Sequence, residues 1–193
     1  LTCIMSMIDE IKKTIEILRN GGVILYPTDT IWGLGCDATN PAAVQKVYDL
    51  KRRAEAKSML ILVDSPAKLQ AYVEEIPDMA WDLIELTTKP LTIIYPGAKN
   101  LAPNLTGDDR TIGIRVTSEE FSKRLCEMFR KPIVSTSANI SGEKSPARFS
   151  EISDEIKNAV DYVVNYRKNE TTPAHVSSII KLGTGNQIEI IRQ

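Results

Sequence analysis

Residues 23–50 read VILYPTDTIWGLGCDATNPAAVQKVYDL, and this segment sets the class of fold. Its first four residues form an apolar run that predicts a short buried strand, ended by Pro27. Its last part predicts a helix that has Asn40 as its N-terminal cap and Pro41 at its first position, and that ends near Leu50. A strand, a polar loop and a helix in this order are typical of α/β proteins.

Helices and strands alternate on both sides of this segment. Apolar residues at helical spacing predict a helix over 6–20 with a cap at Ser6, and another over 118–130 with a cap at Ser118. Further helices are predicted at 66–74, 78–87 and near 149–158, and strands at 59–63, 91–95, 111–116, 133–135, 162–165, 176–182 and 188–191. The pattern predicts one α/β domain, residues 1–193, with a mostly central sheet.

Composition and charge argue against several classes of protein. The 193 residues hold 24 Lys and Arg against 25 Asp and Glu, a net charge of −1, which disfavours a strongly basic nucleic-acid binder. Cys3, Cys36 and Cys126 form no C-x-x-C pair, and His175 is the single histidine, so no metal site of protein side chains and no Ser-His-Asp triad is expected. No membrane span and no signal peptide are predicted, and we expect a cytoplasmic protein.

Two loops that follow predicted strands carry short polar side chains. YPTDTIWGLGCDA, residues 26–38, suits a ligand site at a strand end, although Pro and Gly are equally typical of a simple turn. IVSTSANISGEKSPA, residues 133–147, gathers Ser135, Thr136, Ser137 and Asn139, which suit phosphate oxygens or a ribose, or else a helix cap or an Asx turn. Because both loops follow strand ends, together they are stronger evidence for a ligand site than either loop alone.

The segment LKRRAEAKSM, residues 50–59, concentrates positive charge. Lys51, Arg52, Arg53 and Lys57 stand against one acid, Glu55. This spacing suits a polyphosphate. The alternative is that the basic residues only complement the C-terminal dipole of the preceding helix, which is worth roughly 0.3–1 kcal/mol.

Taken in order, these blocks resemble the YrdC-type threonylcarbamoyl-AMP synthase family. The resemblance rests on YPTDTIWGLGCDA, on K-x-R at Lys51 and Arg53, on TIGIRV at 111–116 and on S-x-N within STSANISG, and it covers about residues 21–192. It implies a twisted mixed α/β sheet with flanking helices and an open concave face. It also implies a nucleotidyltransferase that condenses L-threonine, bicarbonate and ATP, with Mg²⁺, into threonylcarbamoyl-AMP and pyrophosphate for tRNA t6A37 modification.

The same resemblance implies a role for each matching residue. The expected catalytic residues are Lys51 and Arg53. The residues expected to bind ATP are Arg53, Lys57, Thr111, Ser137, Asn139, Ser145 and Arg192. The residues expected to bind threonine are Thr30, Arg115, Ser135 and Ser177, with Arg115 as the natural partner of the carboxylate.

Some features leave alternatives open. Ala54, Ser58 and Leu62 depart from the family's usual pattern, where proline, a P-L pair and a histidine are frequent. The alternatives are a non-catalytic module of the same fold that binds tRNA or double-stranded RNA on its basic concave face, and a paralogue with another substrate. For the synthase, a downstream threonylcarbamoyl-transferase complex is the expected protein partner.

Overall fold

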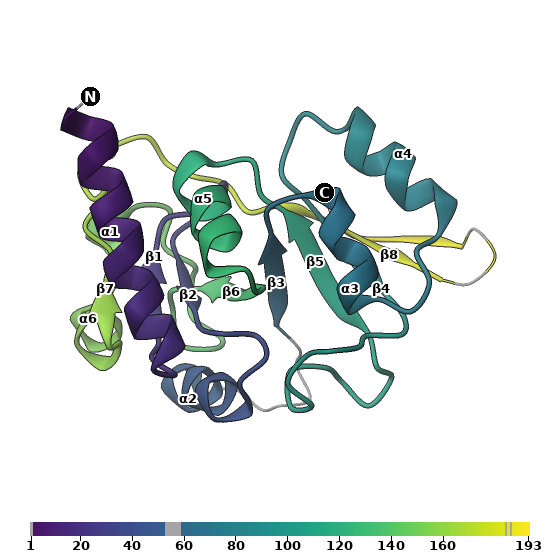
Figure 1. The fold of residues 1–193 in the computed structure, drawn as a ribbon, viewed down its shortest axis with the longest axis horizontal. Coiled ribbons are helices and arrows are strands. Elements are labelled where there is room, and N and C mark those ends of the chain that lie inside the picture. The colour runs from purple at the N-terminus through teal and green to yellow at the C-terminus, as the bar shows by residue number, and fades with distance from the viewer. Residues whose placement is uncertain (1, 53–58, 184, 186) are drawn as a thin grey trace.

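The computed structural model of the chain describes residues 2–52, 59–183, 185 and 187–193 (Figure 1). The helices are α1 (Thr2–Arg19), α2 (Pro41–Lys51), α3 (Leu69–Tyr72), α4 (Asp78–Leu86), α5 (Glu120–Phe129) and α6 (Asp154–Ala159). The strands are β1 (Ile24–Tyr26), β2 (Gly33–Gly35), β3 (Leu60–Val63), β4 (Leu91–Tyr95), β5 (Ile112–Val116), β6 (Ile133–Ser137), β7 (Tyr162–Val163), β8 (Ser178–Leu182) and β9 (Ile188–Arg192). The predicted site residues Arg53 and Lys57, and the departures Ala54 and Ser58, lie outside the described residues.

The strands form one mixed sheet of nine strands in the order β7-β1-β2-β6-β3-β5-β4-β8-β9. The pairs β3–β5 and β4–β8 are parallel, whereas β1–β2, β3–β6 and β4–β5 are antiparallel. In Figure 1 the sheet runs across the whole molecule, from β7 beside α6 to the β8–β9 ribbon. The predicted α/β class with a mixed sheet and flanking helices is confirmed.

The structure confirms one predicted helix cap and differs from several other local predictions. The Asn40 cap is confirmed, since its side chain accepts hydrogen bonds from the amides of Ala42 and Ala43. The cap of α5 is Glu119 rather than Ser118, because the Glu119 carboxylate reaches the amides of Phe121 and Ser122. The first helix starts at Thr2 and not at Ser6, and the predicted helix at 66–74 is a 3-10 turn (Pro66–Lys68) followed by α3.

The two faces of the sheet are covered unequally. One face packs against α2, α3 and α4 in a large apolar core that includes Val47, Leu69, Ala80, Ile93 and Ile114. The other face packs against α1 and α5 in a second core, whose strand members are Ile24, Tyr26, Leu60, Leu62, Ile133 and Tyr162. Within the described ranges, no residue of β4, β5, β8 or β9 belongs to that second core. Helices therefore cover one half of this face and leave the other half open.

Glu10 joins α1 to the segment that begins with β7. Its side chain is buried, and its Oε1 accepts hydrogen bonds from the Tyr162 hydroxyl at 2.7 Å and from the Asn165 amide at 2.6 Å. Burial first, and then the hydrogen bond to Glu10, raise the pKa of Tyr162 to about 12. The neutral phenol is thus favoured in the folded state compared with the unfolded chain, where tyrosine titrates near 10.

This contact predicts a pH dependence of stability. Tyr162 contributes its full stabilisation below about pH 10, and the contribution is lost as the pH rises through about 12. Chemical denaturation of the wild type and of Tyr162→Phe should therefore give free energies of unfolding that converge across this interval. A constant difference between the two proteins would contradict the raised pKa of Tyr162 in the folded state.

Candidate active site

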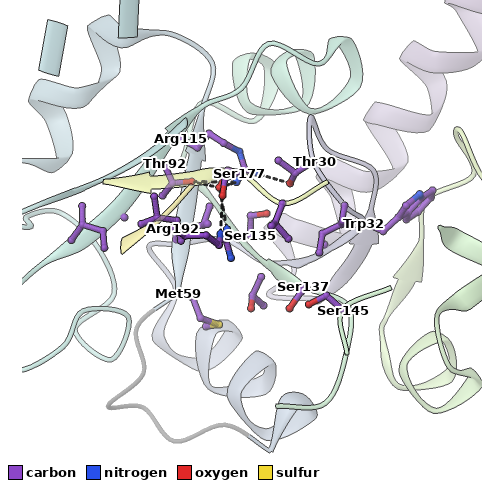
Figure 2. Close-up of a pocket in the computed structure, with 18 residues that line it drawn as sticks. Thr30, Trp32, Met59, Thr92, Arg115, Ser135, Ser137, Ser145, Ser177 and Arg192 are labelled. Carbon is purple, nitrogen blue, oxygen red and sulfur yellow. Dashed lines mark hydrogen bonds between the residues drawn. The ribbon is translucent and has the colours of Figure 1, made fainter. Parts of the chain in front are cut away.

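The open half of the sheet carries a pocket of about 250 Å³ (Figure 2). Its floor is formed by residues of neighbouring strands that share one face, among them Thr92 and Ile94 of β4 and Gly113 and Arg115 of β5. Its walls come from three loops that are far apart in the sequence, since Thr30, Ser145 and Ser177 all line it. Figure 2 shows the polar side chains of these segments turned toward a common space.

Arg115 lies at the centre of a buried polar network. Its Nε donates to Asp29 Oδ1 at 2.9 Å, and the two side chains are 3% and 5% exposed. Its Nη2 donates to the Thr30 hydroxyl at 3.1 Å, and its Nη1 lies 3.4 Å from the Thr92 hydroxyl and 3.5 Å from that of Ser177. Asp29 therefore fixes the guanidinium plane from behind, so that the terminal nitrogens point to the pocket side.

Arg192 reaches the same pocket because of an irregularity in β9. Ile180 is opposite Ile190, but the next pair is Ile179 opposite Arg192, so Ile191 is an extra residue in the strand, a β-bulge. Regular alternation would turn Arg192 to the face of Ile180. The bulge instead places Arg192 on the face of Ile179, and both residues line the pocket.

Two guanidinium groups thus converge on one cavity. Arg192 donates from Nε to the Ser177 carbonyl oxygen at 2.8 Å and from Nη2 to its hydroxyl at 3.4 Å. Burial, and then the positive charge of Arg115, lower the pKa of Arg192. Each arginine raises the electrostatic cost of the other, so an anion bound between them is stabilised by both. The geometry and charge of this pocket suit an anion.

Lys51 holds the loop that follows β6. Its ammonium is almost fully buried and donates to the carbonyl oxygens of Ser137 and Asn139 at 2.5 and 2.7 Å, and its own carbonyl oxygen accepts from the Ser141 amide. The side-chain nitrogen of Asn139, Nδ2, in turn donates to the carbonyl oxygens of Ile140 and Glu143. The end of α2 and the loop after β6 are therefore held as one unit.

The structure brings together most of the residues that the sequence singled out. Seven of them line the pocket: Thr30, Arg115, Ser135, Ser137, Ser145, Ser177 and Arg192. Lys51 and Asn139 lie behind the loop after β6 and do not line the pocket. Thr111 does not line the pocket either, and its hydroxyl donates to Asp109 Oδ1 at 2.8 Å. Leu62, at the position where the family often has histidine, is buried in the core beneath α1 and α5.

Two residues of the site were missed by sequence reasoning. Thr92 lines the pocket and shares a 2.9 Å hydrogen bond with Ser177. A signal was available, because Thr92 and Tyr95 are the polar residues of the otherwise aliphatic strand LTIIY. Asp29 lies within the quoted loop 26–38, but nothing in the sequence pairs it with Arg115, which is 86 positions away.

The described part of the chain has neither a metal-binding cluster nor a membrane-spanning helix. It holds no group of three or more His, Cys, Asp or Glu side chains arranged for a metal ion. None of its helices is long and apolar enough to cross a membrane.

The fold and the pocket define an open-faced α/β protein with an anion site. The family model for Sua5, YciO and YrdC proteins, described as "Telomere recombination", matches residues 16–193. The chain belongs to this family, which confirms the resemblance seen in the sequence. The match includes every residue that lines the pocket.

Individual relatives agree with this assignment. The chain is 38% identical over 164 residues to a threonylcarbamoyl-AMP synthase of Pseudoalteromonas translucida, covering 83% of this chain and 88% of the relative. It is 30% identical over 192 residues to that of Vibrio cholerae, covering 98% and 100%. The crystal structure of P. abyssi Sua5 complexed with L-threonine superposes with a TM-score of 0.80 at 26% identity, covering 89% of this chain. The chain spans about half, 50%, of that Sua5 protein.

Proposed function

We propose that the chain is an L-threonylcarbamoyladenylate synthase. The observation that carries the proposal is the convergence of Arg115 and Arg192 on one hydroxyl-lined pocket, because the reaction needs sites for a carboxylate and for phosphates. The relatives that bear this enzyme name, and the Sua5 structure with L-threonine, support it. The proposal takes residues 1–193 as one YrdC-like domain that works in the cytoplasm.

Threonine occupies the Arg115 end of the pocket in this proposal. The guanidinium binds the carboxylate, with the hydroxyls of Thr30 and Ser177 beside it. Ser135 contributes a further hydroxyl from β6. The amine of threonine attacks the carbon of bicarbonate, one amine proton leaves with the departing hydroxide as water, and a carbamate forms.

ATP, as its Mg²⁺ complex, occupies the other end. The residues proposed to bind it are those that the resemblance implied: Arg53, Lys57, Thr111, Ser137, Asn139, Ser145 and Arg192. A carbamate oxygen attacks the α-phosphorus, and the bond from that phosphorus to the bridging oxygen breaks, so that pyrophosphate leaves. Positioning and charge stabilisation by these side chains supply the catalysis, with Lys51 and Arg53 as the proposed catalytic residues. The product adenylate passes to a downstream threonylcarbamoyl-transferase complex that acts on tRNA.

Pyrophosphate release tests this proposal. Purified protein with MgATP should release pyrophosphate only when both L-threonine and bicarbonate are present. L-Serine, which lacks the methyl group, serves as the matched substrate control. Release that does not depend on threonine or bicarbonate would overturn the proposal in favour of another substrate, and no release together with salt-sensitive RNA binding would favour the RNA-binding module.

Gly113 gives a prediction about the floor of the pocket. A Cβ atom at this position would lie 3.3 Å from both Leu60 Cβ and Thr92 Cγ2, so the two neighbouring strands leave little room for a side chain. Gly113→Val should fill the floor and lower the affinity for L-threonine by about tenfold or more, while the sheet still forms. Calorimetric titration measures this, and Glu127→Val, at an exposed position of α5, tests whether a new valine as such matters. An unchanged affinity of Gly113→Val for L-threonine would show that the ligand does not contact the pocket floor at Gly113.

A further inference from the structure

A second cavity, of about 280 Å³, lies beside the Arg115–Asp29 pair at the ends of β3 and β5, and it extends onto the opposite face of the sheet. The pocket described above uses Thr92, Ile94, Gly113 and Arg115, whereas this cavity is lined by the alternate residues Leu91, Ile93, Ile114 and Val116. Alternate residues of a strand point to opposite faces, so at β4 and β5 the two cavities lie on opposite sides of the sheet. The proposed synthase reaction gives the second cavity no role.

Asp29 belongs to the wall of this cavity and is incompletely satisfied. Its Oδ1 binds Arg115, but its Oδ2 is buried and has no hydrogen-bond partner among the described residues. The side chain is 5% exposed. A buried carboxylate oxygen without a donor destabilises the folded state, so this atom marks a place where a donor is missing.

The remaining wall indicates which donor fits. A second carboxylate, Asp64, lines the cavity, and both carboxylates are close enough to Cys126 to raise the pKa of its thiol, after the larger effect of burial. Hydroxyl side chains of Ser65 and Ser118 are also present. The apolar part of the wall comes from the side chains of Ile84, Leu91, Ile93, Ile114 and Val116. Two carboxylates beside an aliphatic wall match a primary ammonium group on a short aliphatic chain.

We propose that the cavity beside Asp29 binds a small aliphatic ammonium compound, with its ammonium group at Asp29 and Asp64. Lys89 and Lys123, which are exposed side chains on the wall, suit a carboxylate on the same ligand, so aliphatic amino acids fall within the class. At about 280 Å³, the cavity has room for a molecule of that size.

Binding in this cavity is coupled to the first pocket through Asp29. With the cavity empty, the Asp29 charge offsets that of Arg115. An ammonium at Asp29 Oδ2 gives the set of ammonium, Asp29 and Arg115 a net positive charge. A carboxylate bound at Arg115 then completes a row of alternating charges, from the ammonium through Asp29 and Arg115 to the carboxylate. The ligand should therefore raise the affinity of the first pocket for L-threonine, and by linkage threonine should raise the affinity of the cavity. This coupling rests on the proposed threonine site, whereas binding in the cavity does not.

Calorimetric titration with n-butylammonium chloride tests the binding. Saturable binding is expected for the wild type and for Ser135→Ala, which alters only the first pocket, and at least fivefold weaker binding for Asp64→Asn. Asp82→Asn on α4 loses the same charge outside the cavity and should bind like the wild type. Ile84→Trp, which fills the cavity, serves as a second variant that also prevents binding if Asp64→Asn does not fold. No saturable binding, equal binding by Asp64→Asn, or equal binding of potassium chloride or 1-butanol would overturn the proposal.

A second titration tests the coupling. L-Threonine should bind about fivefold more tightly when n-butylammonium is saturating, and this gain should disappear in Asp64→Asn. Weaker threonine binding would mean that the amine competes in the first pocket, and it would overturn the coupling. If threonine does not bind under any condition, the proposed synthase function fails, while the titration with n-butylammonium still decides the cavity.

Discussion

Arg115→Met is expected to lower the affinity for L-threonine by about 100-fold or more. Truncating one partner of a buried, hydrogen-bonded charge pair costs about 2–5 kcal/mol, and here the guanidinium faces both Asp29 and the proposed carboxylate. The loss should appear in the KM for threonine and in direct titration, while the affinity for ATP changes little. Threonine affinity within threefold of the wild type would rule out Arg115 as the carboxylate site.

The variant needs a control for folding, because it leaves the Asp29 carboxylate buried and without its partner. Such a change costs about 3–5 kcal/mol of stability. The double variant Asp29→Asn, Arg115→Met removes both charges and should regain much of the stability without regaining threonine binding. Arg124→Met, an exposed arginine on α5, should behave like the wild type in both respects.

Lys51→Met is expected to reduce the rate of pyrophosphate release by about 100-fold or more. The Lys51 ammonium binds the carbonyl oxygens of Ser137 and Asn139, so its loss releases the loop that carries Ser137 into the pocket. Hydrogen bonds to charged groups contribute about 1.5–3 kcal/mol, so the free energy of unfolding should fall by a similar amount. The kcat is the parameter to measure, together with thermal unfolding.

Lys46→Met provides a closely matched control for this variant. Lys46 also lies on α2 and its ammonium also donates to a backbone carbonyl oxygen, that of Gly21 at 3.0 Å, but away from the pocket. It should lose some stability and keep its turnover. If Lys51→Met turns over like the wild type, the basic residues that begin with Lys51 only complement the C-terminal dipole of α2, which is the alternative that the sequence left open.

Local signals in the sequence were sufficient for much of the fold. Asn40 and Pro41 start α2 because capping depends on neighbouring residues alone. The strand β2 was missed because GLG, residues 33–35, has no side-chain pattern to read. Its glycines are required by packing instead: a Cβ at Gly35 would lie 2.7 Å from the Val134 carbonyl oxygen and 2.6 Å from the Tyr26 ring. That constraint exists only once β1 and β6 lie on either side.

The site was predictable as a set of residues and not as a geometry. The motifs identified the polar loops and Arg115, but the ion pair with Asp29 joins segments 86 positions apart. The direction of Arg192 depends on the bulge at Ile191, since simple alternation in IEIIR turns it away from the pocket. The position of the Lys51 ammonium behind the loop depends in the same way on tertiary contacts that no motif describes.

In the proposed function, this pocket joins threonine, bicarbonate and ATP into one product. Mass spectrometry of a reaction with isotopically labelled bicarbonate, L-threonine and MgATP tests it most directly. The expected result is threonylcarbamoyl-AMP that carries the label in its carbamoyl carbon, formed by the wild type and by Arg124→Met and lost in Arg115→Met. An adenylate without the label, or the same labelled product from Arg115→Met at the wild-type rate, would contradict the claim.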